Sequence, residues 1–579
     1  MTSLIKSIAL KNFKGFSHEI RIELRPITLL FGANSAGKSS VLHALQYVRE
    51  ILERNNTNAD RTLNGGNSID LGGFQNVLHG RLEQTDAVPN RKIEIEVELA
   101  LGDTSIPELV PDAFEDWQTN DGEVWSFYET LQTIRRKVST VSVRLIVGWN
   151  NLREEPVVVG YEVGTNGNWC VKLEASSDGR DTRMRINREN TIFMVDAPDN
   201  DELLAELSDW ISPDDLGDTD AAVLHSSESE SNSNHGDNLI PKKVSVLPEV
   251  FLAVQEAGME RPGDGLRSWL NGFNGALPRL DQMLFIPAPG AKGAANVYIA
   301  REFTAFLSWL TIGPALLLRE QLRKLRYIGP LRRIPPRGFD VSLTKSDAAW
   351  SDGMAAWESL LSGPQSLVDT CSEWMSSADK LGTGYGLSRK YLQEFDLSTP
   401  EPRPVGRRRP RISLTDIAGL AHQAQDIGVG ISQVLPVVVA AQDASASVVC
   451  IEQPELHIHP SIQVGLGDLF IDGAVNKGLS FLIETHSEHL VMRIQRRLRE
   501  QSAGELPETS ATLTPDDVSF IYVGRDDQGA VTASQIGLTS DGKFDSPWPN
   551  GFFSERAAEV LPTAMRSKFE AVRRGGKPS

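Results

Sequence analysis

Apolar and polar positions at the start of the chain predict strands, a glycine-rich turn and a helix in direct succession. Residues 18–25 alternate apolar and polar side chains, and residues 26–31 form a continuous apolar run suited to a buried strand. After the glycine-rich segment 32–39, apolar residues recur at helical spacing over 41–52. We therefore expect the turn to leave a buried strand and to open directly into a helix.

The rest of the chain shows a strand-rich region, a helical region and a final block of mixed patterns. Alternating segments between about 91 and 163 predict antiparallel strands, and helical patterns dominate from about 247 to 326. Residues 445–490 have the pattern of strand, helix and strand, which favours a parallel unit. No heptad run of three or more repeats occurs, so we expect no long coiled coil.

Two irregular segments interrupt these patterns. Residues 212–238 are rich in Ser, Asp, Glu and Asn and predict a mobile acidic insertion, because they bury too little apolar area to offset chain entropy. Residues 398–411 are rich in proline and arginine and predict an irregular linker. We expect an N-terminal part of a head domain over 1–100, a β-rich insertion over 101–246, a helical lobe and linker over 247–420, a C-terminal part of the head over 421–500 and a C-terminal extension over 501–579.

Composition indicates a globular protein whose overall charge disfavours anionic partners. Of 579 residues, 40% are apolar and 23% are charged, which is enough for a sizeable core. Acidic residues outnumber basic ones 77 to 58, a net charge of −19, so nucleic acid could bind only at a local basic patch. Cys170, Cys371 and Cys450 are too few and too far apart for a disulfide scaffold and suit a reducing, cytoplasmic location. The longest apolar run, 303–318, is too short and interrupted to cross a bilayer, so we expect no membrane association.

The segment 32–39, GANSAGKS, matches the whole GxxxxGK[ST] pattern of phosphate-binding loops, with a chance glycine turn as the alternative. Its glycines let consecutive backbone N–H groups point at phosphate, and the following helix adds the positive end of its dipole. Lys38 supplies a charge to the β- and γ-phosphates, and Ser39 offers a hydroxyl to Mg²⁺. We therefore expect ATP and Mg²⁺ as cofactors, held by Gly32, Asn34, Ser35, Ala36, Gly37, Lys38, Ser39 and Ser40.

Polar side chains follow two later apolar strands. Glu452 ends the run 448–452, where a phosphate loop needs a carboxylate to hold its metal. Gln453 follows in the place where many ATPases carry a second acid, and Glu455 is either the base for an attacking water or a residue that caps the turn. His486 ends the next strand, where it either senses a γ-phosphate through a hydrogen bond or is simply solvated.

A further candidate segment, DIGVGISQ at 426–433, precedes an apolar helix pattern. Gly428 and Gly430 ahead of Ser432 form either an anion-binding turn at a helix start or an ordinary glycine cap of the same form. Taken alone, the pattern supports both interpretations equally.

The motifs GANSAGKSS, DIGVGISQVLP, CIEQPELHIHP and ETHSEHL stand in the order seen in ABC-type ATPases of the SMC/RecF/OLD group. The chain resembles most the bacterial AAA-type ATPases that lack the long coiled coil, among them the ATPase subunits of Septu-like and retron-associated anti-phage defence systems. The resemblance covers about 1–80 and 320–550. It implies an α/β fold with an ABC-type P-loop ATPase head, in which a mixed sheet carries a β-rich lobe and a helical lobe, followed by a C-terminal extension.

The resemblance also implies an assembly. Two copies would hold two ATP molecules head to tail, with Gly430 and Ser432 of one subunit on the γ-phosphate held by Lys38 of the other. A homodimer or a higher even-numbered oligomer is therefore expected. Gln75 lies where the family's metal-contacting glutamine falls, with an ordinary loop glutamine as the alternative. The candidate catalytic residues are Lys38, Glu452, Gln453, Glu455 and His486, and the candidate metal ligands are Ser39, Glu452 and Gln75.

The chain departs from the family at the pair of acids at the end of the run 448–452, and this difference affects how fast ATP could be hydrolysed. Where the family carries a pair of acids, this chain has Glu452 and Gln453, and an amide can orient water but cannot accept its proton. We expect a slow ATP-hydrolysing switch that controls a separately encoded effector, such as an HNH-type nuclease, in anti-phage defence. The alternatives are an ATP-bound scaffold with little turnover and a RecF-like DNA-repair clamp.

Two arginine clusters motivate the last alternative: Arg403, Arg407, Arg408, Arg409 and Arg411 in one, and Arg493, Arg496, Arg497 and Arg499 in the other. No aromatic residues interleave with either cluster, which disfavours base stacking. A solvated surface is the default interpretation, and contact with a nucleic-acid backbone is the alternative. The adjacent Asp526 and Asp527 predict a hairpin turn, so we expect no nuclease centre in this chain.

Overall fold

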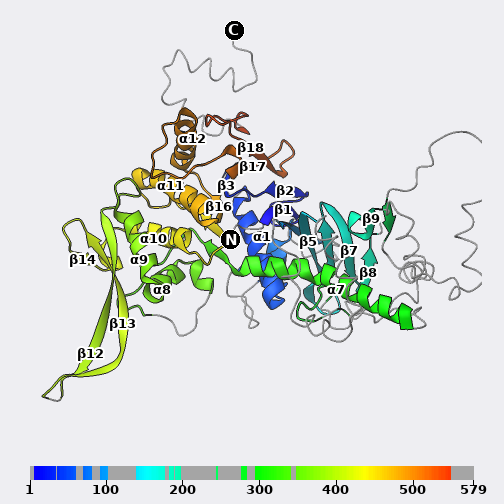
Figure 1. The fold of residues 1–579 in the computed structure, drawn as a ribbon, viewed down its shortest axis with the longest axis horizontal. Helices are drawn as coiled ribbons and strands as arrows, with labels where there is room; N and C mark the ends of the chain where they lie inside the picture. The colour runs from blue at the N-terminus through cyan, green and yellow to red at the C-terminus, as the bar shows by residue number, and fades with distance from the viewer. Residues whose placement is uncertain are drawn as a thin grey trace, which may run out of the picture.

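The computed structural model describes the greater part of the chain, and Figure 1 shows its fold. The described residues are 5–33, 36–59, 70–80, 91–101, 138–176, 182–187, 189–196, 243–245, 275–282, 284, 294–340, 347–398 and 400–549. Asn34, Ser35 and the acidic segment 212–238 lie outside them. None of the helices in the described ranges is long and apolar enough to cross a membrane.

A six-stranded sheet forms the centre of the fold. In spatial order its strands are β11 (Leu325–Ile328), β15 (Val448–Glu452), β16 (Ser480–Glu484), β3 (Ile27–Phe31), β17 (Val518–Arg525) and β18 (Val531–Ile536). The first five are parallel, and β18 pairs antiparallel with β17. All residues of β3 and β15 are buried, as the continuous apolar runs predict for a parallel sheet covered on both faces. The fold is therefore a mixed α/β fold, as expected.

A seven-stranded antiparallel sheet forms the β-rich lobe, which lies to the right in Figure 1. In spatial order its strands are β2 (Ile20–Glu23), β1 (Ile5–Lys11), β4 (Ile93–Ala100), β5 (Thr140–Asn150), β6 (Glu155–Thr165), β7 (Asn168–Ala175) and β8 (Thr182–Ile186). Buried and half-buried residues alternate along β4, as its sequence pattern predicts. The lobe includes the N-terminal strands and does not begin at residue 101. The short strands β9 (Met194–Asp196) and β10 (Lys243–Ser245) pair separately.

Alternate residues of the central strands belong to two hydrophobic cores, one on each face of the sheet. Leu30 belongs to the core that α1 and the β-rich lobe share, whereas Leu29 and Phe31 belong to the core under α8 to α12. The helices are α1 (Lys38–Arg54), α2 (Phe74–Val77), α7 (Ala294–Arg323), α8 (Met354–Ser362), α9 (Gln365–Ser376), α10 (Val429–Gln442), α11 (Pro460–Lys477) and α12 (Glu488–Ala503). Single 3₁₀ turns lie at Thr191–Phe193, Asp347–Trp350, Ala424–Asp426 and Pro515–Asp517.

The long helix α7 connects the head to the β-rich lobe (Figure 1). It contains the apolar run 303–318, which is therefore a core helix, with Pro314 inside it. The Tyr161 hydroxyl on β6 is fully buried and donates to the Thr311 carbonyl of α7 at 2.6 Å. Of the helical patterns predicted over 247–326, residues 247–274, 283 and 285–293 lie outside the described part of the chain.

The proline-rich linker prediction is wrong for residues 403–411. They belong to β13 (Arg403–Asp416), which forms a long hairpin with β12 (Tyr385–Asp396). Among the described residues, only Leu414 and Thr415 pair β13 on its other side, with β14 (Ala421–His422). The outer edge of β13 is thus unpaired along its arginine- and proline-rich part, so prolines without N–H groups cost this strand little.

The segment assigned to a C-terminal extension also contributes to the head. Strand β17 pairs with the phosphate-loop strand β3, from Val518 with Ile27 to Tyr522 with Phe31. The turn predicted at Asp526 and Asp527 joins β17 to β18, where the Asp526 carboxylate accepts from the Ala530 N–H. Residues 518–536 are therefore part of the central sheet.

Replacing Tyr161 with Phe tests the contact between α7 and the β-rich lobe. The substitution removes a buried hydroxyl from the Thr311 carbonyl, so the free energy of unfolding should fall by about 1 kcal/mol. Chemical denaturation measures this change. The exposed Tyr391 on β12 is the matched control, and Tyr391→Phe should leave the unfolding free energy within about 0.5 kcal/mol. Equal losses in the two variants would contradict the assignment.

Candidate functional site

The phosphate loop follows β3 at the edge of the sheet where parallel strands end. Gly32 has φ 141°, and a Cβ there would lie 1.9 Å from the Val523 carbonyl of β17, so only glycine fits. Gly37 has φ 107° and precedes the first residue of α1. The expected order of buried strand, glycine loop and helix is therefore confirmed. Neighbouring β15 and β16 end at the same edge and bring their last residues to the loop.

Lys38 is buried beneath the loop, with 3% of its surface exposed. Its Nζ donates to the Gly32 carbonyl at 3.0 Å and to the Ala33 carbonyl at 2.9 Å. Burial lowers the pKa of Lys38, while the nearby carboxylates of Glu484 and Glu455 oppose that shift. The ammonium group is thus held at the loop by groups that an anionic phosphate can replace.

Glu484, the last residue of β16, is the carboxylate that meets Ser39. The Ser39 hydroxyl donates to Glu484 Oε2 at 2.5 Å, and Lys38 Nζ lies 3.8 Å from Glu484 Oε1. Burial raises the pKa of Glu484, and the charge of Glu452 adds to this effect. Glu484 is not among the residues predicted from the sequence, although it ends an apolar strand just as Glu452 does. The register of β15 and β16 places Glu452 directly beside it.

Glu452 is held by a separate polar cluster. Its Oε1 accepts from the Tyr327 hydroxyl at 2.7 Å and lies 3.0 Å from His43 Nε2, while Lys14 Nζ lies 2.6 Å from His43 Nδ1. Burial raises the pKa of Glu452, but the hydrogen bond and charge of His43 outweigh it and leave the pKa lowered. Burial lowers the pKa of Lys14 to about 8. The two carboxylates at this edge therefore differ in environment, and the surroundings of Glu452 favour its ionised form.

The oxygens of Ser39, Glu484 and Glu452 fit a magnesium ion. Mg²⁺ prefers hard oxygen ligands and is usually bound by one or two carboxylates together with substrate phosphates. Within the described ranges no group of three or more His, Cys, Asp or Glu could hold a metal by itself. The site is thus incomplete as a protein-only cage and suits a metal that arrives with a nucleotide.

Glu455 and His486 lie together, as a shared active site requires. Glu455 Oε2 accepts from the Thr485 hydroxyl at 2.8 Å, and its Oε1 accepts from the His486 backbone N–H at 2.7 Å. Burial raises the pKa of Glu455, which suits a base, yet both of its oxygens already accept hydrogen bonds. Burial, followed by the charge of Lys38, lowers the pKa of His486, so its imidazole is neutral at pH 7. The buried His486 Nε2 has no hydrogen-bond partner among the described residues and is available to a ligand.

Gln453 takes a strained backbone conformation at the end of β15. Its φ is 45°, and its N–H donates to the Glu484 carbonyl at 2.8 Å. A non-glycine residue held in this region is common at functional sites. The neutral side chain therefore occupies a position that the backbone of two strands defines.

The glycine segment ahead of α10 is connected to this edge through Arg332. Arg332 Nη2 donates to the Glu452 carbonyl at 2.7 Å, and the Gln433 amide donates to the Arg332 carbonyl at 2.6 Å. Ser432 is fully buried, and its hydroxyl donates to the Ala424 carbonyl at 3.1 Å. A Cβ on Gly430 would lie 2.6 Å from the His457 carbonyl, which explains this glycine by close packing.

The structure does not bring every predicted residue to the loop. No hydrogen bond or ion pair joins Gly430 or Ser432 to the described part of the phosphate loop. Gln75, on α2, is exposed and makes no hydrogen bond within the described ranges. Asn34 and Ser35 lie outside those ranges, so the loop is seen at Gly32, Ala33 and from Ala36 onward.

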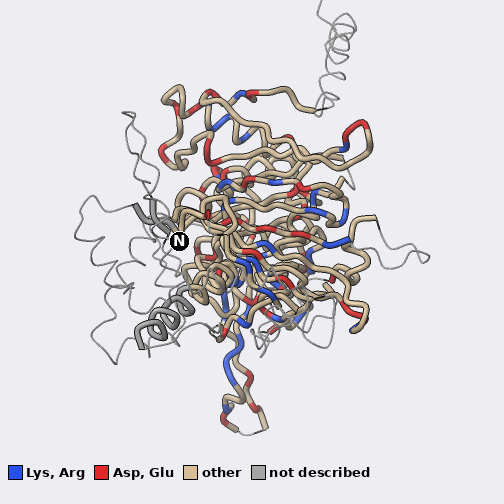
Figure 2. Tube along the Cα trace, turned by 90° about the vertical axis from the view of Figure 1, so that its right-hand side faces the viewer, with Lys and Arg blue, Asp and Glu red and all other residues tan. Residues whose placement is uncertain are grey.

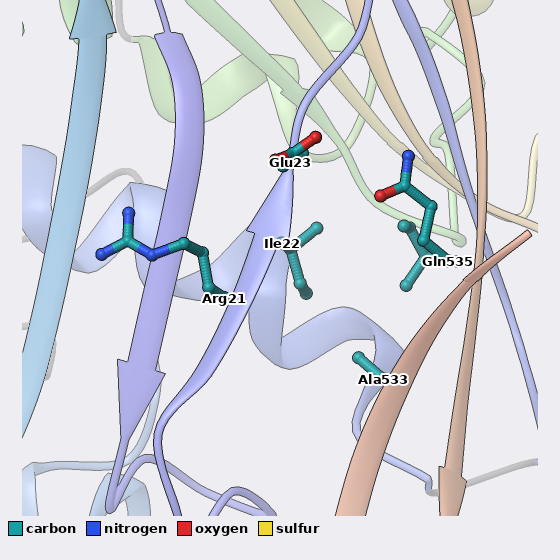
Figure 3. Close-up of a pocket in the computed structure, with 6 residues that line it drawn as sticks. Arg21, Ile22, Glu23, Ala533 and Gln535 are labelled. Carbon is teal, nitrogen blue, oxygen red and sulfur yellow. The ribbon is translucent and has the colours of Figure 1, made fainter. Parts of the chain in front are cut away.

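Figure 3 shows a different cavity, between β2 and β18, of about 210 Å³. Its lining includes Arg21, Ile22, Glu23 and Gln535. None of its lining residues belongs to the candidate site. The cavity is therefore separate from the phosphate loop and from the carboxylates that meet it.

Two family models match the chain. Residues 4–152 match the model described as "AAA ATPase domain", and residues 385–493 match the model described as "AAA domain, putative AbiEii toxin, Type IV TA system". The chain carries the AAA-type domains of an ATP-binding ATPase. The first match contains the phosphate loop, and the second contains Ser432, Glu452 and His486.

No curated protein matches this ATPase chain. Solved structures similar to it are heads of Smc proteins. A crystal structure of an Smc head bound to the C-terminal winged-helix domain of ScpA has 12% identity, covers 92% of this chain and 98% of its own, and gives a TM-score of 0.36. An Smc head with an extended coiled coil from Pyrococcus furiosus has 13% identity, coverages of 92% and 96%, and a TM-score of 0.35. The head from Thermotoga maritima has 8% identity, coverages of 93% and 99%, and a TM-score of 0.32.

Replacing Glu484 with Gln tests its place beside Ser39. The amide keeps the size of the side chain but removes the charge, so Mg²⁺-dependent binding of a fluorescent ATP analogue should weaken about 10- to 100-fold. Binding without Mg²⁺ should not weaken, because Lys38 remains and the variant carries one negative charge fewer beside the phosphates. The exposed Glu508 is the control, and Glu508→Gln should bind as the wild type does. Unchanged Mg²⁺ dependence in Glu484→Gln would contradict the assignment.

Proposed function

We propose that the protein is a molecular switch that hydrolyses ATP slowly and controls a partner effector. The observation that carries this proposal is the meeting of Lys38 and Ser39 with Glu484, Glu452 and His486, which come from distant parts of the sequence, at one edge of the central sheet. These groups are a cation for phosphates, a hydroxyl and carboxylates for a metal, and a neutral imidazole. Together they match the requirements of phosphoryl transfer from ATP to water.

Each group has a defined task in this proposal. Lys38 leaves the loop carbonyls and neutralises the β- and γ-phosphates, while the backbone N–H groups at the start of α1 bind the same phosphates. Ser39, Glu484 and Glu452 hold Mg²⁺, which draws charge from the phosphate oxygens when bound. His486 directs its unpartnered Nε2 at the γ-phosphate.

The neutral Gln453, in place of a second acid beside Glu452, limits the rate of ATP hydrolysis in this proposal. Gln453 can orient the attacking water but cannot accept its proton, and Glu455 is engaged by Thr485 and His486. This observation also favours a second candidate function, a scaffold that binds ATP and barely turns it over. The two candidates differ in turnover and share the nucleotide site.

The proposed switch closes as a head-to-tail dimer. No hydrogen bond or ion pair joins Gly430 or Ser432 to the described part of their own phosphate loop, which supports a role of this segment on the nucleotide of a second subunit. In that role the buried Ser432 hydroxyl would leave the Ala424 carbonyl. Gly428 caps α10, is exposed, and has open space around the position of a Cβ. This segment thus offers a free surface to another copy, and Arg332 connects it to Glu452.

The proposed partner is a separately encoded nuclease of the HNH type, in defence of a bacterial cell against phage. The resemblance to ATPase subunits of Septu-like and retron-associated systems supports this role, and the second family model carries the description of a toxin of a toxin–antitoxin system. We place the switch in the cytoplasm, where its free, buried Cys170, Cys371 and Cys450 stay reduced.

Phosphate release distinguishes the switch from the scaffold. The wild type should release phosphate slowly, and Lys38→Ala should abolish release because the phosphates lose their cation. Gln453→Glu should raise the rate at least about tenfold by supplying a base, and Glu455→Gln should lower it. A large gain in Gln453→Glu with no loss in Glu455→Gln would favour the scaffold. A rate that Lys38→Ala leaves unchanged would overturn the site itself.

Mixing two inactive variants tests the dimer. Gly428→Glu places a negative charge in open space within the glycine segment 426–433 and should block hydrolysis by repelling the partner's nucleotide. Lys38→Ala blocks the phosphate loop. Equal mixing should restore about a quarter of the wild-type rate, because half of the dimers are mixed and each has one intact site. Absence of any recovery, with both variants folded by circular dichroism and exchanging subunits, would count against a head-to-tail dimer.

A further inference from the structure

The two arginine clusters differ sharply in their partners. On α12, Arg493 and Arg497 pair with Asp468 at 3.0 and 2.7 Å, and Arg496 pairs with Glu500 at 2.6 Å. Asp468 and Glu500 thus pair with three of the four arginines on α12, and Arg499 has no partner among the described residues. On the β12–β13 hairpin, Arg407 and Arg409 lie 3.7 and 3.9 Å from Asp340, and Arg409 also pairs with Glu394 at 3.5 Å. Arg403 and Arg408 have no partner among the described residues.

The hairpin is a positively charged projection from an acidic protein. Figure 1 shows it extending away from the helices of the head, and Figure 2 shows Lys and Arg along the half nearer the body. Seven Lys and Arg face four Asp and Glu between residues 385 and 416, in a chain of net charge −19. The hairpin is therefore the local basic patch that an anionic polymer would need.

The two faces of the hairpin have different surroundings. Lys390, Leu392 and Arg411 line a cavity of about 350 Å³ together with Phe339 and Trp357 of the body. Side chains alternate between the faces of a strand, so this face is turned toward the head. The opposite face is directed away from that cavity.

The opposite face carries two exposed aromatic rings. Tyr391 is 59% exposed and Phe395 is 52% exposed. They are four residues apart on β12, hence on one face and about 14 Å apart. Pro410 pairs with Tyr391. Arg408 lies two residues before Pro410, where the pairing of β13 with β12 is irregular, and its side chain is exposed, whereas its neighbours Arg407 and Arg409 reach Asp340.

The Tyr391 ring has the guanidinium of Arg389 as a neighbour on β12. The Arg389 guanidinium lies 6.0 Å from the ring centroid and donates to the Gly363 carbonyl at 2.7 Å. It also donates to the carbonyls of Leu360 and Leu361. A ring supported by a fixed cation is a rigid stacking platform, even though the hairpin projects into solvent.

The absence of interleaved aromatics, inferred from the sequence, is therefore corrected by the structure. The aromatic residues lie on β12 and the arginines on β13, and only the pairing of the two strands brings them together. Tyr391 and Arg408 are far apart in the sequence, so the sequence alone does not show that an aromatic ring and an arginine lie close together on the hairpin.

We propose that this outer face of the hairpin binds single-stranded nucleic acid, an activity beyond the ATPase. Two bases stack on Tyr391 and Phe395, whose spacing of about 14 Å matches two extended nucleotides. Arg408 contacts the phosphate between them. Aromatic platforms alternating with cations are the features by which proteins bind unpaired strands, whereas a duplex hides the faces of its bases.

Fluorescence anisotropy of the full-length protein with labelled oligo-dT and oligo-rU of about 20 nucleotides, at about 50 mM salt, tests the proposal. Tyr391→Ala and Phe395→Ala should each weaken binding about tenfold through lost stacking. Arg408→Ala should lower the slope of log affinity against log salt by about 0.7 through one lost phosphate contact. All of these residues are exposed, so unfolding free energy and phosphate release should match the wild type.

The matched control is Arg496→Ala, an exposed arginine already paired with Glu500, which should bind as the wild type does. Three results would overturn the proposal. The first is no binding at low salt, or binding that Tyr391→Ala leaves unchanged. The second is an Arg496→Ala loss equal to that of Arg408→Ala. The third is binding of duplex DNA or of polyglutamate as tight as that of the single strand, and polyglutamate binding would assign the hairpin to an acidic protein instead.

Discussion

The structure depends on one constraint, a parallel sheet that is buried on both of its faces. Such strands must be almost continuously apolar, so their buried residues are not available for catalysis or ligand binding. Polar residues are found mainly where the strands end. The carboxyl ends of β3, β15 and β16 therefore concentrate the functional groups of the chain at one edge. The same constraint divides the interior into two cores, because alternate residues of each strand face α1 and the β-rich lobe or the helices α8 to α12.

The electrostatics of that edge follow from how each carboxylate is hydrogen-bonded. Glu452 receives donors from Tyr327 and His43, which favour its ionised form, whereas Glu484 is buried beside it with a raised pKa. Two negative charges in neighbouring register repel each other. A divalent cation held by Glu452 and Glu484 would relieve this repulsion, which supports the proposed role of these carboxylates in binding Mg²⁺ together with the nucleotide.

Much of the site was readable from the sequence, because its motifs sit where strands end. The pattern of apolar runs located β3, β15 and β16, and the glycine loop located Lys38 and Ser39. Glu484 was not predicted, because the polar motif Thr485-His486 directly follows it and itself indicates the functional end of the strand. The hairpin was missed for another reason. Its prolines and arginines read as an irregular linker, and only strand pairing reveals that a proline on an unpaired edge costs little.

The position of β17 has a consequence for how the protein is made. The phosphate-loop strand β3 emerges early in synthesis, yet its neighbours on both sides, β16 and β17, belong to the last hundred or so residues of the chain. Gly32 itself packs against the Val523 carbonyl. Until β17 has left the ribosome, β3 lacks a neighbouring strand on that side, and the phosphate loop lacks the β17 backbone against which Gly32 packs. A nascent or truncated chain would therefore bind no nucleotide, and a switch of this kind could not be engaged before it is complete.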